Sequence, residues 1–142
     1  MDLHEIASPI QKHMPVFDTV FREALRSRVG LVTLITKYIM RQKGKKVRPI
    51  LVFLSADVCG SVNERSHRGA TLVEILHTAT LVHDDVVDNA DTRRGFASIN
   101  AVWKNKIAVL MGDYLLSRGL LLSLENDDFE FLKITSTAVR RM

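Results

Sequence analysis

The sequence is poor in the residues that break helices or cross-link a chain. Among 142 residues there are only three prolines, seven glycines and one cysteine. The single cysteine, Cys59, excludes an internal disulfide framework and is compatible with a reducing compartment. The first residues lack the basic and then apolar pattern of a signal peptide, and no uninterrupted apolar run approaches the roughly 18 residues of a membrane span. We therefore expect a cytoplasmic protein with no transmembrane segment.

Composition and charge are those of an ordinary globular domain. Hydrophobic residues make up 46% of the chain and charged residues 25%. The formal charge of +4 is too small an excess to indicate nucleic-acid binding by itself. A chain of this length can bury a proper core, and no linker or repeat divides it. We expect one domain over residues 1–142 and no nucleic-acid partner.

Helical periodicity dominates the chain, which predicts an all-α fold. Pro49 suits the first turn of a helix, and residues 107–124 are apolar enough to form a buried helix. Residues 89–98 are expected to form a loop. The expected helices cover residues 9–28, 31–42, 49–58, 65–88 and 107–124, with a last helix from 127 or 128 that is still running at residue 142.

Residues 83–95 carry the strongest functional signal. Asp84, Asp85 and Asp88 end an apolar helical run, and Arg93 and Arg94 follow one short loop later. Crowded carboxylates repel one another unless a cation or solvent relieves them. Mg²⁺ is typically held by one or two carboxylates plus substrate phosphate oxygens, and arginine matches phosphate geometry. The pattern predicts a metal and phosphate site, although structural ion pairs at a solvated helix end also cluster charges.

Two further features bear on this site. Asp84 and Asp88 are four residues apart and share one helix face, which leads back to His77 two turns earlier. A histidine on an apolar helix is more often a core residue than a ligand. The basic run at residues 41–48 has no interleaved aromatics, so it makes a poor nucleic-acid patch. It is either a solvated helix end or a phosphate cradle in which Gly44 lets the backbone approach a ligand.

Four segments together resemble the trans-isoprenyl diphosphate synthases, also called polyprenyl synthetases. His83 to Asp88 followed by Asp91 to Gly95 is similar to the first aspartate-rich motif of that family. The other three are Gly44 to Pro49, which resembles the Gly-Lys-Arg-x-Arg-Pro segment, Glu74 to Val82, which resembles the helix leading into the metal site, and Gly112 to Leu116, which resembles a Gly-Asp-x-Leu-Leu helix. They follow the order of the family and cover roughly residues 40–120.

The resemblance implies an antiparallel helical bundle of the isoprenoid synthase type around a deep cavity, usually as a homodimer. Family members continue to a second aspartate-rich helix that faces the first across the cavity. No segment of this sequence resembles that second motif. The chain therefore resembles the N-terminal part of a synthase, and we expect it to be inactive alone.

The resemblance also implies an activity: magnesium-dependent condensation of isopentenyl diphosphate with an allylic diphosphate such as geranyl or farnesyl diphosphate. The allylic diphosphate ionises, the double bond of isopentenyl diphosphate attacks the cation, and loss of a proton leaves an all-trans product five carbons longer. Asp84 and Asp88 would hold Mg²⁺, Asp85 would support the catalytic site, and Arg93 would contact the allylic diphosphate. The implied ligands of isopentenyl diphosphate are Lys45, Arg48, His77 and Arg94. Lys46 stands where the family usually has arginine and is not expected to be a ligand.

Product length follows from residues four and five positions before the first aspartate, which lie beside the growing chain in the family. Here they are Thr80 and Ala79. Short-chain synthases place bulky aromatics there, so small residues predict an open channel and a medium- or long-chain product, for example of the octaprenyl type.

Two other functions stay open. The His83-Asp84 pair could belong to a metal-dependent phosphohydrolase, which would need further histidines such as His67 or His77 at the metal. Alternatively, the chain could be a non-catalytic subunit that binds a partner prenyl synthase.

Overall fold

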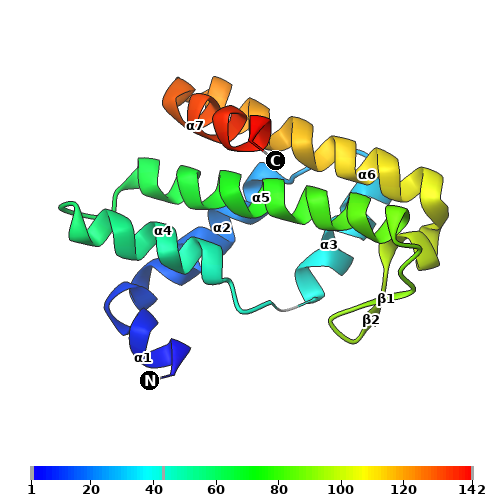
Figure 1. The fold of residues 1–142 in the computed structure, drawn as a ribbon, viewed down its shortest axis with the longest axis horizontal. Helices are drawn as coiled ribbons and strands as arrows, with labels where there is room; N and C mark the ends of the chain where they lie inside the picture. The colour runs from blue at the N-terminus through cyan, green and yellow to red at the C-terminus, as the bar shows by residue number, and fades with distance from the viewer. Residues whose placement is uncertain (1, 43, 142) are drawn as a thin grey trace.

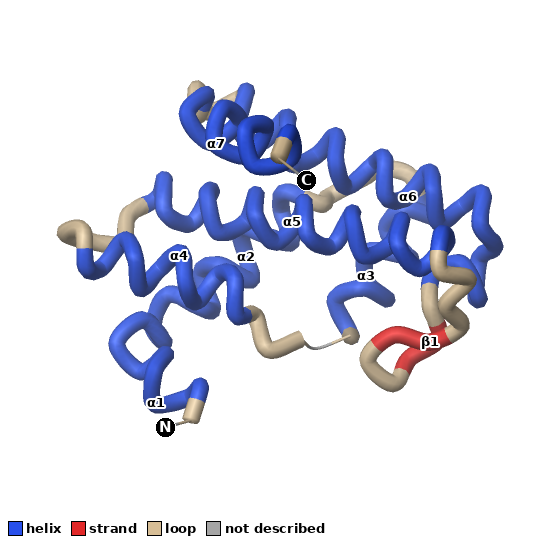
Figure 2. Tube along the Cα trace, viewed as in Figure 1, coloured by secondary structure: helices blue, strands red, loops and turns tan. Residues whose placement is uncertain are grey.

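The computed structural model describes residues 2–42 and 44–141. Helices dominate this part of the chain, and one small hairpin interrupts them (Figures 1 and 2). Lys43, in the basic run noted above, lies outside the described residues. In chain order the elements are α1 (Leu3–Ala7), the 3₁₀ helix η1 (Ser8–His13), α2 (Met14–Ala24), α3 (Gly30–Arg41), α4 (Val47–Val58), α5 (Glu64–Val87), β1 (Thr92–Arg93), β2 (Phe96–Ala97), α6 (Ile99–Leu124) and α7 (Phe129–Arg140).

The predicted all-α fold is confirmed, and α3, α4 and α5 match the expected helices to within two residues. The N-terminal stretch differs from its prediction. Pro9 and Pro15 each lie in the first two residues of a separate helix, where a missing N–H costs nothing, so η1 and α2 are distinct. The helix expected to reach Arg28 ends at Ala24.

Helix α5 is the centre of the molecule. Figure 1 shows it between α4 on one side and α6 on the other, with α2 packed behind it. Its start is fixed by Asn63, whose side chain accepts a hydrogen bond from the backbone N–H of Ser66 at 3.1 Å. The helix then runs without a break to Val87. This uninterrupted length carries the aspartates from the core to one end of the molecule.

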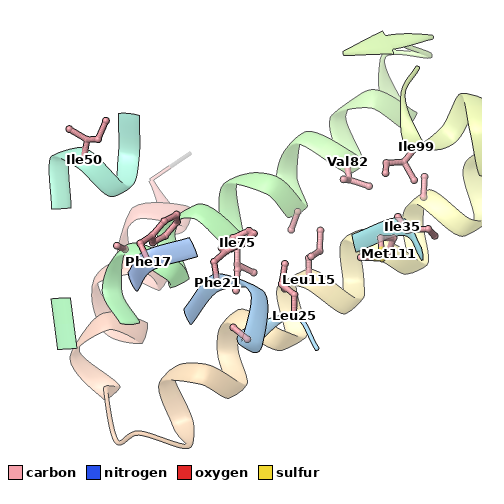
Figure 3. Close-up of a cluster of buried hydrophobic side chains, with 14 of the residues drawn as sticks. Phe17, Phe21, Leu25, Ile35, Ile50, Ile75, Val82, Ile99, Met111 and Leu115 are labelled. Carbon is pink, nitrogen blue, oxygen red and sulfur yellow. The ribbon is translucent and has the colours of Figure 1, made fainter. Parts of the chain in front are cut away.

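The core lies where α2, α5 and α6 meet (Figure 3). Phe17 and Ile75 are 1% and 0% exposed, and Leu115 of α6 is 0% exposed. Gly119 allows α6 to approach α5 closely, since a Cβ there would lie 3.3 Å from Ile75 Cγ2. Because α6 is packed tightly on α5, the aspartate-bearing end of α5 has a rigid support.

Helix α6 differs from its prediction in start and burial. It begins at Ile99 rather than at residue 107, and the non-helical angles of Lys104 (φ 69°, ψ 162°) divide it by a kink. The expected burial was wrong for much of the helix, because it is apolar around its circumference and the described helices cover only one side. The exposed leucines are Leu110, Leu116, Leu120, Leu121 and Leu124.

By length and composition, α6 is also the one helix among the described residues that could cross a membrane, with a mean hydropathy of 1.5. The expectation drawn from uninterrupted runs missed it, because Asp113 and Arg118 divide the apolar sequence. An apolar helix of this kind is equally typical of a protein core.

The segment predicted to be a loop contains a two-stranded antiparallel hairpin. Arg93 pairs with Phe96 in register, so Arg94 and Gly95 form a two-residue turn. Both turn residues have positive φ, 51° and 80°, as a type I′ turn requires. Glycine accepts this conformation readily, whereas arginine adopts it uncommonly. The turn places Arg94 at the tip of the hairpin.

Candidate active site

The three aspartates at the end of α5 have two different environments. Asp84 and Asp88 are exposed, whereas Asp85 is only 2% exposed. Helical geometry explains the difference, because successive residues point about 100° apart while residues four apart share a face. The structure therefore leaves one pair of carboxylates open to solvent and turns the third inward.

Asp85 is fully occupied by Arg93. The Arg93 Nε donates to both carboxylate oxygens at 2.9 and 2.8 Å, and Nη2 donates to Oδ1 at 2.6 Å. This hydrogen bonding raises the pKa of Arg93 above its already high value. A charge-assisted pair of this kind fixes the arginine geometrically. It ties the hairpin to α5, and both Asp85 oxygens accept hydrogen bonds from Arg93.

An open cavity of about 570 Å³ lies against this ion pair. Its walls come from α2, α3, α5, the hairpin and the start of α6, and they combine apolar residues such as Phe21, Ile39 and Leu81 with polar and charged ones. Asp85, Arg93 and Arg94 all line it, so three of the predicted site residues meet at one cavity. Lys45, Arg48, His77, Asp84 and Asp88 do not line it.

Arg94 joins the hairpin to the basic run. Its Nη1 donates to the backbone carbonyl of Gln42, at the end of α3, over 3.3 Å. The guanidinium occupies the space where a Cβ on Gly44 would be, so only glycine fits there without moving the arginine. The sequence suggested that Gly44 lets a ligand approach the backbone. In this structure the group that approaches is Arg94.

The remaining basic residues divide into a structural and an exposed set. Lys46 forms an ion pair with Asp18 of α2 and has a positive φ of 49° at the start of α4. It therefore anchors the basic run to α2, and it also lines the cavity. Lys45 and Arg48 are exposed.

The positive charges of the arginines act on the pKa values of Glu74 and His77. Burial raises the pKa of Glu74, and the charges of Arg48, Arg94 and Lys46 offset part of that rise. Burial lowers the pKa of His77, and Arg48, Arg94 and Arg93 lower it further. Arg48 and Arg94 thus act on the same stretch of α5 although they lie 46 residues apart in sequence. Their convergence creates a region that favours anions.

Ala79 and Thr80, the predicted product-length residues, have different environments. Ala79 is 2% exposed within the core cluster, and Thr80 is exposed. Adjacent helical residues point in directions about 100° apart, so they cannot both border the same surface equally. Neither lines the cavity. The proposed role of these two residues in product length stays a prediction.

His83 is turned away from the aspartates toward α6. Its Nε2 lies 3.2 Å from the carbonyl oxygen of Val109 and 3.4 Å from Asp113 Oδ1. His67 lies on α5 16 residues before His83, roughly 24 Å along the helix axis. Across residues 2–42 and 44–141, no three His, Cys, Asp or Glu side chains are placed to share a metal ion. The geometry gives no support to a histidine-based phosphohydrolase.

The exposed pair Asp84 and Asp88 fits magnesium chemically. Two carboxylates on one helix face supply the hard oxygen ligands that Mg²⁺ prefers, and the ion completes its shell with water and phosphate oxygens. The fit therefore requires a phosphorylated ligand nearby, which the converging arginines would attract.

Sequence reasoning missed Glu74 at the cavity and Tyr38 beside the hairpin. Glu74 was noted only as part of a motif, although it lines the cavity. Tyr38 of α3 was not singled out at all, yet its hydroxyl donates to the backbone carbonyl of Ala97 in β2 at 2.8 Å. No local pattern reports a contact between residues 59 apart in sequence.

Comparison with known proteins identifies the chain. Residues 30–142 match the family model described as polyprenyl synthetase. The chain is 40% identical over 134 residues to the all-trans-nonaprenyl-diphosphate synthase (geranyl-diphosphate specific) of Rhodobacter capsulatus, covering 94% of this chain and 41% of that protein. It is 35% identical over 139 residues to the octaprenyl diphosphate synthase of Escherichia coli, covering 98% and 43%.

A solved structure agrees. The polyprenyl synthase of Caulobacter crescentus, complexed with calcium and isoprenyl diphosphate, superposes with a TM-score of 0.91 at 29% identity, covering 98% of this chain and 42% of that one. The chain thus spans about two fifths of the length of these relatives. Fold, motif order and sequence identity agree, and the chain belongs to the polyprenyl synthetase family.

Proposed function

We propose that this chain is the N-terminal part of a trans-polyprenyl diphosphate synthase that makes a medium- or long-chain product from isopentenyl diphosphate and an allylic diphosphate. The observation that carries the proposal is the exposed pair Asp84 and Asp88 beside a cavity at which Arg93 and Arg94 converge. The similarity to nonaprenyl and octaprenyl synthases supports the longer product. The relatives' activity is that of proteins more than twice as long, so the complete reaction is part of the proposal.

The aspartates and Arg93 would have different roles in binding the allylic diphosphate. Asp84 and Asp88 would hold Mg²⁺, which supplies Lewis-acid stabilisation of the departing diphosphate. Arg93, fixed by Asp85, would present its remaining N–H groups at a constant position toward the allylic diphosphate. Such preorganised positive charge costs no reorganisation when the leaving group develops its charge.

The second substrate would bind through Lys45, Arg48, His77 and Arg94. The influence of Arg48 and Arg94 on the pKa of His77 supports this grouping. The lowered pKa keeps the His77 ring neutral at pH 7, so it would bind as a neutral hydrogen-bonding group while the arginines supply the charge. The apolar wall at Phe21, Ile39 and Leu81 would exclude water that could quench an allylic cation.

A prenyl-transfer assay tests the proposal. The chain is incubated with radiolabelled isopentenyl diphosphate, farnesyl diphosphate and Mg²⁺, and products are separated by chain length. We expect Mg²⁺-dependent binding of farnesyl diphosphate but no elongation, because the chain holds one aspartate pair. In an active form that contains this segment, label should enter a product longer than farnesylgeranyl diphosphate. Release of phosphate without any binding-dependent chain growth in that form would contradict the proposal.

A non-catalytic partner subunit is the second candidate, and the uncovered apolar side of α6 favours it. Leu110, Leu116 and Leu120 are 63%, 42% and 42% exposed. Extensive exposed apolar surface is typical of an association site. If the chain copurifies with a prenyl synthase and changes its product length without itself binding farnesyl diphosphate, this second function replaces the first. A homodimer and a cytoplasmic location remain parts of the proposal.

A further inference from the structure

The hairpin of β1 and β2, which carries Arg93 and Arg94, has few internal contacts to hold it in place. Its two strands contain only two residues each, Thr92–Arg93 and Phe96–Ala97, and two-stranded hairpins are marginally stable by themselves. Arg94 at its tip has a positive φ, which disfavours the turn further. External contacts must therefore fix the position of both arginines.

One of these contacts comes from α5 and one from α3. The Asp85–Arg93 pair holds β1 to α5. On the other strand, the Tyr38 hydroxyl donates to the carbonyl of Ala97 at 2.8 Å. Ala97 lies opposite Thr92 in the strand register, at the open end of the hairpin.

The ring of Tyr38 adds a second contact. It stands edge-on to Trp103, with ring centroids 5.1 Å apart, and edge-on to Phe96 at 6.4 Å. Edge-to-face geometry at these separations is favourable for aromatic pairs. Tyr38 therefore touches the hairpin through its hydroxyl and through Phe96, and touches the first turns of α6 through Trp103. We refer to Tyr38, Phe96 and Trp103 as the aromatic clamp.

We infer that Tyr38 is a positioning residue for diphosphate recognition. It holds the hairpin against α3 and so sets the distance between Arg94 and the end of α3, where Arg94 bonds to Gln42. This inference rests on the proposed function, since it concerns the same diphosphate site. Tyr38 itself touches no substrate in this account and acts through the two arginines.

The chain offers a matched control. Its only other tyrosine, Tyr114, also donates its hydroxyl to backbone carbonyls distant in sequence, those of Leu25 at 3.3 Å and Arg26 at 3.2 Å. These contacts tie α6 to the end of α2, far from the hairpin in the chain. Tyr38→Phe and Tyr114→Phe each remove one hydroxyl and keep one ring.

The ligand test uses inorganic pyrophosphate with Mg²⁺, measured by calorimetry on the whole chain. We expect Tyr38→Phe to weaken binding about tenfold, roughly 1.4 kcal/mol, and Tyr114→Phe to change it less than twofold. Equal effects of the two substitutions would overturn the inference. If the wild-type chain binds no pyrophosphate, the proposed function fails. Hydrogen exchange then tests separately whether Tyr38 holds the hairpin in place.

Hydrogen exchange tests the clamp without any ligand. Ser98 N–H donates to the carbonyl of Asp91 across the base of the hairpin, so its exchange reports whether the hairpin is closed. Tyr38→Phe should raise exchange at Ser98 and in the strands at least fivefold, and Tyr114→Phe should leave those sites unchanged. Unaltered hairpin exchange in Tyr38→Phe would overturn the inference whatever the chain binds. Trp103, the only tryptophan, gives a fluorescence signal for the same contact.

Discussion

Arg93 holds Asp85 through two of its nitrogen atoms, at 2.6 to 2.9 Å, where the Asp85 side chain is 3% exposed. Of the three aspartates in the motif, Asp85 therefore holds the hairpin to α5, whereas the other two face solvent. It also fixes one of the two neighbouring arginines and leaves the other to contact the basic run.

Breaking this pair should destabilise the chain. Asp85→Asn leaves Arg93 with a poorer partner and should lower the free energy of unfolding by about 3 kcal/mol, as for other buried pairs that lose one partner. Arg93→Ala should cost at least as much, because it leaves a buried carboxylate unpaired. Urea unfolding checks both. If the double variant loses the sum of the two single losses, the residues do not interact and the account of the pair is wrong.

Gly44→Ala should separate stability from anion binding. The added Cβ would displace the Arg94 guanidinium, which is the end of a flexible side chain. The free energy of unfolding should therefore change by less than about 1 kcal/mol. Pyrophosphate affinity should fall about tenfold, because Arg94 leaves the Gln42 carbonyl. Gly30→Ala is the control, since nothing lies within 4 Å of its added Cβ. Unchanged affinity in Gly44→Ala would remove Arg94 from the site.

Stability should fall as the pH drops below about 6.5, the ordinary pKa of histidine. Burial lowers the pKa of His67, and His13 lowers it further. Below pH 6.5 the unfolded chain therefore binds a proton that folded His67 resists, so unfolding is favoured until the lower folded pKa is reached.

His67→Phe tests this dependence on pH. The His67 ring packs at 4.9 Å from Phe53 and 5.5 Å from His13, so phenylalanine keeps the aromatic contact and removes the titrating group. Melting temperatures of this variant between pH 7 and 5 should decline less steeply than those of the wild type. Parallel declines would show that His67 does not cause the effect.

Product length is best tested at Thr80 rather than at Ala79. Ala79 is 2% exposed in the core, so Ala79→Phe should overpack it and cost about 1–3 kcal/mol. Thr80 is exposed, and Thr80→Phe should leave the fold intact. In an active form of the protein, Thr80→Phe should shorten the main product by at least one five-carbon unit. An unchanged product distribution, with normal stability, would mean that the channel runs elsewhere.

Local pattern predicted most helices and placed Asp84 and Asp88 on one helix face, but it could not predict how the helices are arranged. The extent of α5 and the four-residue spacing of Asp84 and Asp88 are local properties, so the sequence predicted both. The hairpin at Arg93 was missed because its strands contain only two residues each. Its stability depends on contacts with α3 and α5 that no local pattern reports.

The same reason explains the error on α6. Apolar sequence predicts that a helix can be buried, but which side is covered depends on its neighbours. Leu115 and Leu116 are adjacent in sequence and are 0% and 42% exposed. Local pattern likewise does not report that Ala79 lies in the core cluster, 2% exposed, while its neighbour Thr80 is exposed.

The most direct test of the account is calorimetric titration of the chain with inorganic pyrophosphate, with and without Mg²⁺, compared with the Asp84→Asn/Asp88→Asn double variant. Both aspartates are exposed, so the variant should fold normally. The account predicts that pyrophosphate binding depends on Mg²⁺ and falls at least tenfold in the double variant. Equal binding by wild type and variant in the presence of Mg²⁺, or no binding by the wild type, would contradict it.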